Sequence, residues 1–230
     1  RIPSSRPVQV INAGVPAYTL RDNLVRLSRD ILPLKPDLVI SYHGINGFYL
    51  LDPAVPRTSG RAPPAFNPRP LRLLADAEYR WKMIRYRRSR TPGLAENASN
   101  LSSPTNCQYA AAYRELIQIT RTNGIRLALA SFSMAVNSQS DMAVAEFYRF
   151  GTPGVHRMVK VNAAHTDMVR QLCGEHEGVI FVDTHPGLDG CTDMFIDLIH
   201  FSQPGRQQLA ENMFQALRPF LEQELQPLRP

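Results

Sequence analysis

The sequence predicts an α/β protein in which a parallel sheet carries helices on both faces. Four short, β-rich apolar runs alternate along the chain with longer segments whose apolar residues recur at helical spacing. The chain has 230 residues, 43% hydrophobic and 20% charged, which is enough to bury one sizeable core. We therefore expect a single domain over residues 1–230, with a long insertion at about residues 48–106.

The first half of the predicted sheet comes from two runs near the start of the chain. Residues 8–13 form a β-rich run that ends at Gly14, and residues 37–42 form a second apolar run. Between them, residues 20–32 repeat leucine and isoleucine at helical spacing, and Pro33 follows as a helix stop. This order of elements predicts a strand, a helix and a second strand.

The second half of the chain repeats the alternation twice. Helical spacing covers residues 107–123, with Gly124 as the stop, and a third strand is predicted at residues 125–132. A long helix is expected from about residue 155 to Gly174, and a fourth strand at 179–183. The last helix is expected at residues 204–221.

In a parallel α/β sheet, binding and catalysis gather beyond the carboxyl ends of the strands. The segments that open there are predicted at residues 14–19, 43–106, 133–153 and 184–201. The long segment after the second strand is rich in proline, and a segment of this kind can build a lid or a specificity wall.

Four residues at these strand ends are our candidate site. Asp197 lies three residues before His200, a spacing that lets a carboxylate hold an imidazole in one orientation and stabilise its charged form. Gly14 offers an unobstructed backbone N–H, and Asn46 offers a side-chain amide donor. Each residue alone has a structural explanation, a strand end for Gly14 and a loop turn for Asn46. Together they predict a general base with an oxyanion hole.

The three blocks that carry these residues resemble the SGNH, or GDSL-type, hydrolase superfamily. The blocks are Val10-Ile11-Asn12-Ala13-Gly14, Tyr42-His43-Gly44-Ile45-Asn46 and Asp197-Leu198-Ile199-His200. The resemblance implies a flavodoxin-like, three-layer α/β/α sandwich and a serine esterase, lipase or other acylhydrolase. Its substrate would be an acyl or acetyl ester, either a small molecule or a carbohydrate ester. It also implies His200 as base and then acid, Asp197 as its orienting partner, Gly14 and Asn46 as oxyanion donors, and no metal or organic cofactor.

The chain departs from the superfamily pattern in two places. Gly47 follows Asn46 where the superfamily usually has aspartate, which questions the geometry of that loop. The superfamily's serine block should precede Val8 by a few tens of residues, so we expect the nucleophile upstream of Arg1, on a central strand that is absent from this chain. Ser133 ends the third predicted strand but lacks a nucleophile elbow, and we do not favour it as a substitute.

We expect no catalytic role for the remaining histidines or for the cysteines. We expect His43 to be a packing or supporting residue beside Asn46 and His185 to line the pocket, whereas we expect His156, His165 and His176 to face solvent. Cys107, Cys173 and Cys191 have no CxxC spacing, which argues against structural zinc. If any disulfide forms, we expect it to join Cys107 to Cys191.

The net charge of +6 is concentrated in one segment. From Leu71 to Arg90 the chain has seven basic and two acidic residues, a net charge of +5, and aromatic and aliphatic residues interleave with the arginines. A basic amphipathic helix of this kind could touch an anionic membrane or a glycan, and a solvated helix is the simpler interpretation. Nucleic acid is not favoured as a binding partner.

Two rival functions remain: a non-catalytic SGNH-like binding module, and a surface-interaction protein that docks through the segment from Leu71 to Arg90.

Overall fold

The computed structural model describes residues 7–55, 104–149 and 154–225. Their sheet has three parallel strands in the order β1-β2-β3: Leu38–Tyr42, Arg126–Ala130 and Val179–Val182. The strands are in register at their carboxyl ends, because Tyr42 pairs with Ala130 and Ala130 pairs with Val182. The predicted α/β class and three of the four predicted strands are confirmed.

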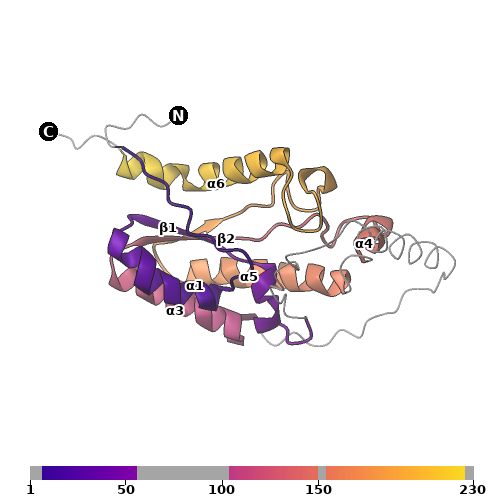
Figure 1. Cartoon of the computed structure of the whole chain (residues 1–230), viewed down its shortest axis with the longest axis horizontal. Helices are drawn as coiled ribbons and strands as arrows, with labels where there is room; N and C mark the ends of the chain where they lie inside the picture. The colour runs from indigo at the N-terminus through magenta and orange to yellow at the C-terminus, as the bar shows by residue number, and fades with distance from the viewer. Residues whose placement is uncertain (1–6, 56–103, 150–153, 226–230) are drawn as a thin grey trace, which may run out of the picture.

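Helices cover both faces of this sheet, so the described chain forms three layers (Figure 1). On one face lie α1 (Leu20–Arg26), α3 (Gln108–Thr122) and α5 (Val155–Glu175), and α6 (Gln203–Glu224) covers the other. A further helix, α4 (Met142–Arg149), occupies a region that we predicted to be a loop. The layers agree with the sandwich that the sequence implied.

The sequence of α1 explains both of its ends. Thr19 and Asp22 form a capping box: the Asp22 N–H donates to Thr19 Oγ1 (3.3 Å) and the Thr19 N–H donates to Asp22 Oδ2 (2.8 Å). The helix continues through a π turn at Leu27–Ile31 and a 3₁₀ turn at Leu32–Leu34. The chain then leaves the helical path at Lys35, whose φ of 51° is left-handed.

The two faces of the sheet are packed differently. Leu127 and Leu129 of β2 point into the large core beneath α3 and α5, whereas Ala128 and Ala130 form a smaller cluster with Leu217 of α6. Side chains alternate in direction along a strand, so the Leu-Ala-Leu-Ala run of β2 gives one bulky and one small face. The small face lets α6 lie close to the sheet.

The predicted strand at residues 8–13 is wrong. These residues have no regular secondary structure, and the exposed fractions of Val8, Val10 and Ile11 are 62%, 88% and 53%. β-branched composition favours a strand only where a neighbouring strand supplies the backbone partners, and among the described residues no strand pairs with this segment. Within the same part of the chain β1 is hydrogen-bonded on one side only, to β2, and its Ile40 is 44% exposed.

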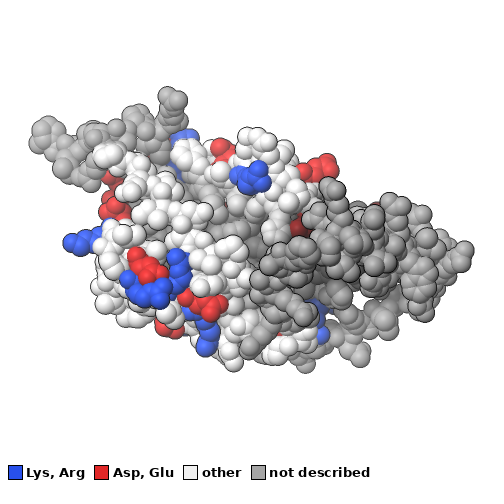
Figure 2. Space-filling model, viewed as in Figure 1, with Lys and Arg blue, Asp and Glu red and all other residues white. Residues whose placement is uncertain are grey.

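The described surface mixes charges of both signs. On the face in Figure 2, acidic and basic side chains lie next to one another. Arg29 and Asp30 form one ion pair between such charges (2.6 Å). The basic segment from Leu71 to Arg90, and with it the suggested membrane or glycan contact, lies outside the described residues. No helix in the described part is long and apolar enough to cross a membrane.

Candidate functional site

Asp197 and His200 form a hydrogen-bonded pair on the turn before α6. The Nδ1 atom of His200 donates to Asp197 Oδ2 over 2.6 Å. The other carboxylate oxygen, Oδ1, accepts the backbone N–H groups of Ile199 (2.9 Å) and His200 (2.8 Å). All of these bonds close within four residues, which explains why the sequence alone identified the pair.

The electrostatics of Asp197 keep it ionised at neutral pH. Partial burial acts to raise its pKa, but the hydrogen bonds from the two backbone N–H groups and from the His200 ring outweigh burial and lower it. An ionised carboxylate accepts hydrogen bonds and cannot donate them, so the proton between the two groups stays on His200 Nδ1. The Nε2 atom is then left with a lone pair that can accept a proton.

The turn that carries this pair is fixed from three directions. Phe195 and Phe201 pair across it as an antiparallel bridge, and the Ala135 N–H donates to the carbonyl of Leu198 over 2.9 Å. The Phe201 ring lies 6.4 Å from the ring of Tyr42, the last residue of β1. The pair therefore lies at the carboxyl edge of the sheet, beside the end of β1, with the His200 side chain 68% exposed.

The predicted oxyanion donors lie in two segments that touch each other. Asn46 Nδ2 donates to the carbonyl of Tyr18 over 3.3 Å, and Arg26 donates to the carbonyl of Ala13 over 2.7 Å. The first bond attaches Tyr18 to the loop of Asn46, and the second attaches Ala13, the residue before Gly14, to α1. The Gly14 N–H itself donates to Asn12 Oδ1 (3.0 Å). Within the described residues no hydrogen bond joins either donor to the Asp197–His200 pair.

The loop has no room for a side chain at Gly47. A Cβ atom at Gly47 would lie 2.6 Å from the Tyr109 ring, closer than real contacts allow. The Tyr109 hydroxyl donates to the carbonyl of Gly44 (3.2 Å), and the Gly44 Cα faces the Phe132 ring, which leaves no room for a side chain. Tyr109 and Phe132 thus occupy the space behind the loop that carries Asn46.

Of the three histidines expected to face solvent, His165 departs most, His156 is half-buried, and His176 is half-buried with its Nε2 atom buried. His43 bridges Ser41 Oγ (2.8 Å) and Asn23 Nδ2 (3.0 Å), a supporting contact between β1 and α1. His165, expected at the surface, is completely buried and bonds the Tyr113 hydroxyl through Nε2 (3.0 Å). Burial lowers its pKa to about 3, so it is neutral. Its position on α5 turns it toward Tyr109 and Tyr113, a contact that helical periodicity alone did not reveal.

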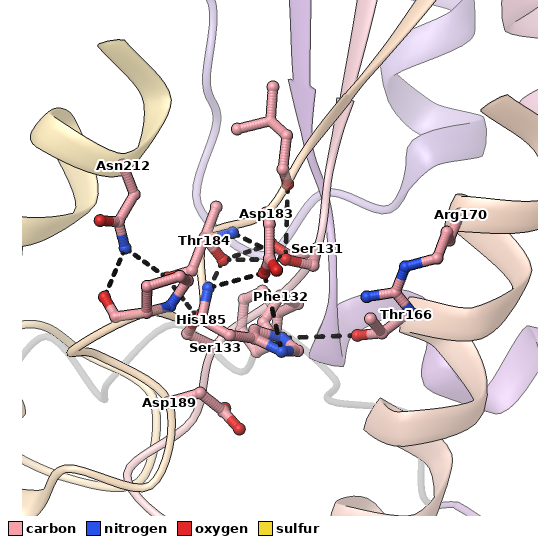
Figure 3. A network of polar contacts seen from close by, with 12 residues as sticks. Ser131, Phe132, Ser133, Thr166, Arg170, Asp183, Thr184, His185, Asp189 and Asn212 are labelled. Carbon is pink, nitrogen blue, oxygen red and sulfur yellow. Dashed lines mark hydrogen bonds and ion pairs between the residues drawn. The ribbon is translucent and has the colours of Figure 1, made fainter. Parts of the chain in front are cut away.

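The serines at the end of β2 belong to a hydroxyl network (Figure 3). Ser133 Oγ donates to the carbonyl of Thr184 (3.2 Å) and lies 2.8 Å from its Oγ1, and Ser131 Oγ accepts the Thr184 N–H (2.9 Å). Both serines are fully buried. These bonds join the segments that follow β2 and β3, so they continue the pairing of the two strands beyond the sheet. In the described chain no hydrogen bond joins a serine to His200.

The thiols and the possible metal ligands do not form a site. Cys107, Cys173 and Cys191 are free, so the conditional disulfide between Cys107 and Cys191 is not present. Across residues 7–55, 104–149 and 154–225, no group of three or more His, Cys, Asp or Glu is placed to hold a metal ion.

Comparison with known proteins finds similarity only at the level of structure. No family model and no curated protein matches the sequence. A crystal structure of Axe2, an acetylxylan esterase from Geobacillus stearothermophilus, matches with a TM-score of 0.52 and 17% identity, over 90% of this chain and 71% of Axe2. The acetyl xylan esterase AlAXEase matches with a TM-score of 0.51 and 14% identity, over 89% of this chain and 79% of that one.

These matches establish that the chain has the three-layer fold of known ester hydrolases. Catalytic mutants of Axe2 have been crystallised in which a serine, an aspartate or a histidine is replaced, and in that enzyme the aspartate and the histidine are three positions apart. Sequence identities of 14–17% do not transfer an activity, so the chemistry has to be argued from the residues of this chain.

Proposed function

We propose that this chain belongs to a serine ester hydrolase of the SGNH type, which cleaves acyl or acetyl esters, including esters carried on carbohydrates. His200 is the general base and then the general acid, and Asp197 orients it. Gly14 and Asn46 supply the oxyanion hole. The nucleophilic serine comes from upstream of Arg1.

The observation that carries this proposal is the 2.6 Å bond between His200 Nδ1 and Asp197 Oδ2. It fixes the tautomer in which Nε2 can accept the proton of a serine hydroxyl, and it places that nitrogen at the carboxyl edge of the sheet. The three-residue spacing of the catalytic aspartate and histidine of Axe2 agrees with that of Asp197 and His200.

The reaction follows from the order of these groups. His200 Nε2 takes the serine proton as the serine oxygen attacks the ester carbonyl, and Asp197 stabilises the imidazolium that forms. The Gly14 N–H and the Asn46 amide turn to the developing oxyanion, exchanging their present bonds with Asn12 and Tyr18. His200 then protonates the leaving alcohol, and water releases the acid by the same steps in reverse.

The outer edge of β1 offers a place for the strand that carries the serine. Within the described residues β1 is hydrogen-bonded on one side only, so its outer edge has unpaired backbone groups that a further strand could bind. A further parallel strand on that edge would end beside Tyr42, whose ring lies near Phe201 and therefore near His200. A serine at the end of such a strand would complete the triad.

The proposal is tested by ester hydrolysis in the intact protein, with p-nitrophenyl acetate and an acetylated xylo-oligosaccharide as substrates. We expect His200→Ala to lower turnover by a factor of about 10³ or more. His156→Ala is the matched control, because that histidine pairs with Glu146 outside the site (3.0 Å), and it should keep wild-type turnover.

Two outcomes would count against the proposal. Equal turnover in the His200→Ala and His156→Ala proteins would remove His200 from the reaction. A folded, intact protein that hydrolyses neither ester would favour the alternative, a non-catalytic SGNH-like binding module.

A further inference from the structure

The last residue of α1 reaches back to the segment that carries one of the proposed oxyanion donors. Arg26 Nη1 donates to the carbonyl oxygen of Ala13 over 2.7 Å, at the short end of the range for N–H···O bonds. A short bond is expected here because the guanidinium donor is charged. Residues 7–15 have no regular secondary structure, so contacts of this kind have to fix the path of the chain.

The bond to Ala13 acts on Gly14 through the peptide group that the two residues share. A trans peptide group is planar, and its C=O and N–H therefore point in opposite directions. When the Arg26 guanidinium holds the Ala13 oxygen, it also restricts the direction of the Gly14 N–H. The cation further polarises this peptide group, which makes the N–H a stronger donor.

The present acceptor of the Gly14 N–H can leave while the peptide group stays where it is. That acceptor is Asn12 Oδ1 (3.0 Å), and Asn12 is exposed, so its side chain can rotate into solvent. The Gly14 N–H is then open to a new acceptor in a direction that Arg26 has already set. Donors whose orientation is set before the reaction are what make an oxyanion hole effective.

The Arg26 guanidinium is itself held by several neighbours. Its Nε lies 3.4 Å from Asp30 Oδ2, its Nη1 donates to Asn23 Oδ1 (3.5 Å), and its Cζ lies 6.0 Å from the centre of the Tyr18 ring. The carbonyl of Tyr18 accepts the amide of Asn46, the second proposed donor (3.3 Å). Arginine suits this position because its donors are spread over a rigid, planar fork.

We propose that Arg26 is a positioning residue for ester hydrolysis, which holds the peptide group between Ala13 and Gly14 so that the Gly14 N–H is directed at the oxyanion. This inference rests on the proposed function, because it needs Gly14 to be an oxyanion donor. Arg26 acts through Gly14 and not on the substrate. Because the oxyanion exists only near the transition state, the loss of Arg26 should lower kcat and leave KM almost unchanged.

The test compares Arg26→Met with Arg29→Met in the intact protein, with p-nitrophenyl acetate as the substrate. Methionine keeps a long apolar stem but has no donor. We expect Arg26→Met to lower kcat about 10- to 100-fold, less than the loss of an oxyanion donor, because the Gly14 N–H itself remains. KM should stay within about three-fold of wild type. Arg29 also pairs with Asp30 (2.6 Å) but is 70% exposed, so Arg29→Met should keep wild-type kcat.

A second measurement follows the contact itself and needs no activity. A hydrogen bond to a carbonyl shifts the ¹⁵N resonance of the next amide, so the Gly14 signal should move in Arg26→Met and stay in place in Arg29→Met. Melting curves establish that each variant is folded at the assay temperature. If Arg26→Met does not fold, Arg26→Lys replaces it; its single ammonium cannot reproduce the fork, and we expect at least about a three-fold loss of kcat and the same movement of the Gly14 signal.

Three results would overturn the role of Arg26 and leave the proposed function intact. The first is equal kcat in the folded Arg26 and Arg29 variants, and the second is a rise in KM with unchanged kcat. The third is a Gly14 signal that does not move when Arg26 is replaced. An intact wild-type protein that hydrolyses no ester, in contrast, would contradict the proposed function and this inference with it.

Discussion

Replacement of Asp197 by asparagine tests the role of the acid-base pair directly. Asparagine can keep its Oδ1 on the backbone N–H groups of Ile199 and His200, so the turn should retain its shape. Its other atom is an NH₂ donor, however, and it would face His200 Nδ1 where Oδ2 now accepts a bond of 2.6 Å. Nδ1 must then become the acceptor, and the proton moves to Nε2.

The expected effects on catalysis and on stability differ in size. A histidine with its proton on Nε2 cannot deprotonate a serine, and an equivalent change of tautomer in a serine protease lowers turnover about 10⁴-fold. That factor corresponds to about 5.5 kcal/mol in the activation free energy. Stability should change by no more than about 1 kcal/mol, because both side chains are more than half exposed and solvent screens their interaction.

The assay combines ester turnover in the intact protein with the ¹⁵N shifts of the His200 ring, which report the tautomer even where no nucleophile is present. Asp193→Asn is the control, since that carboxylate is exposed on the same loop and does not bond the ring. Turnover of Asp197→Asn within ten-fold of wild type would contradict the orienting role of Asp197. A His200 ring that keeps its proton on Nδ1 in this variant would contradict it as well.

Three further predictions follow from the neighbouring residues. Asn46→Ala should slow turnover about 10²–10³-fold with little change in melting temperature; wild-type turnover would remove Asn46 from the oxyanion hole. Gly47→Ala should destabilise the fold by about 1–3 kcal/mol in urea unfolding, because its Cβ meets the Tyr109 ring, and an unchanged midpoint would contradict that packing. Burial lowers the pKa of His165 to about 3, so its contribution to stability is present above its unfolded pKa of about 6.5 and is lost as pH falls from there toward 3. The free energy of unfolding of wild type should therefore fall over that interval more steeply than that of His165→Phe. An equally steep fall in the two proteins would contradict a buried, neutral His165.

Local sequence patterns predicted most of the fold. The apolar runs of β1, β2 and β3 and the helical spacing of α3 and α5 are local signals that agree with the tertiary structure. Residues 8–13 carry the same β-rich signal yet form no strand, because a strand is completed by its neighbour and not by its composition alone. Helix α4 has only eight residues and lies within residues 133–153, which we predicted to be a loop.

The residues of the candidate site and its surroundings also differ in how far the local sequence predicts them. The Asp197–His200 pair was predictable because its bonds close over three residues. The burial of His165 depends on aromatic rings more than fifty residues away in the sequence, and no local pattern carries that information.

The most direct test of the central claim is to label the intact protein with a fluorophosphonate probe and map the modified residue by peptide mass spectrometry. The account predicts one labelled serine upstream of Arg1, with labelling lost in the His200→Ala protein and kept in His156→Ala. A label on any serine within residues 1–230, such as Ser133, would contradict it, and so would labelling that persists without His200.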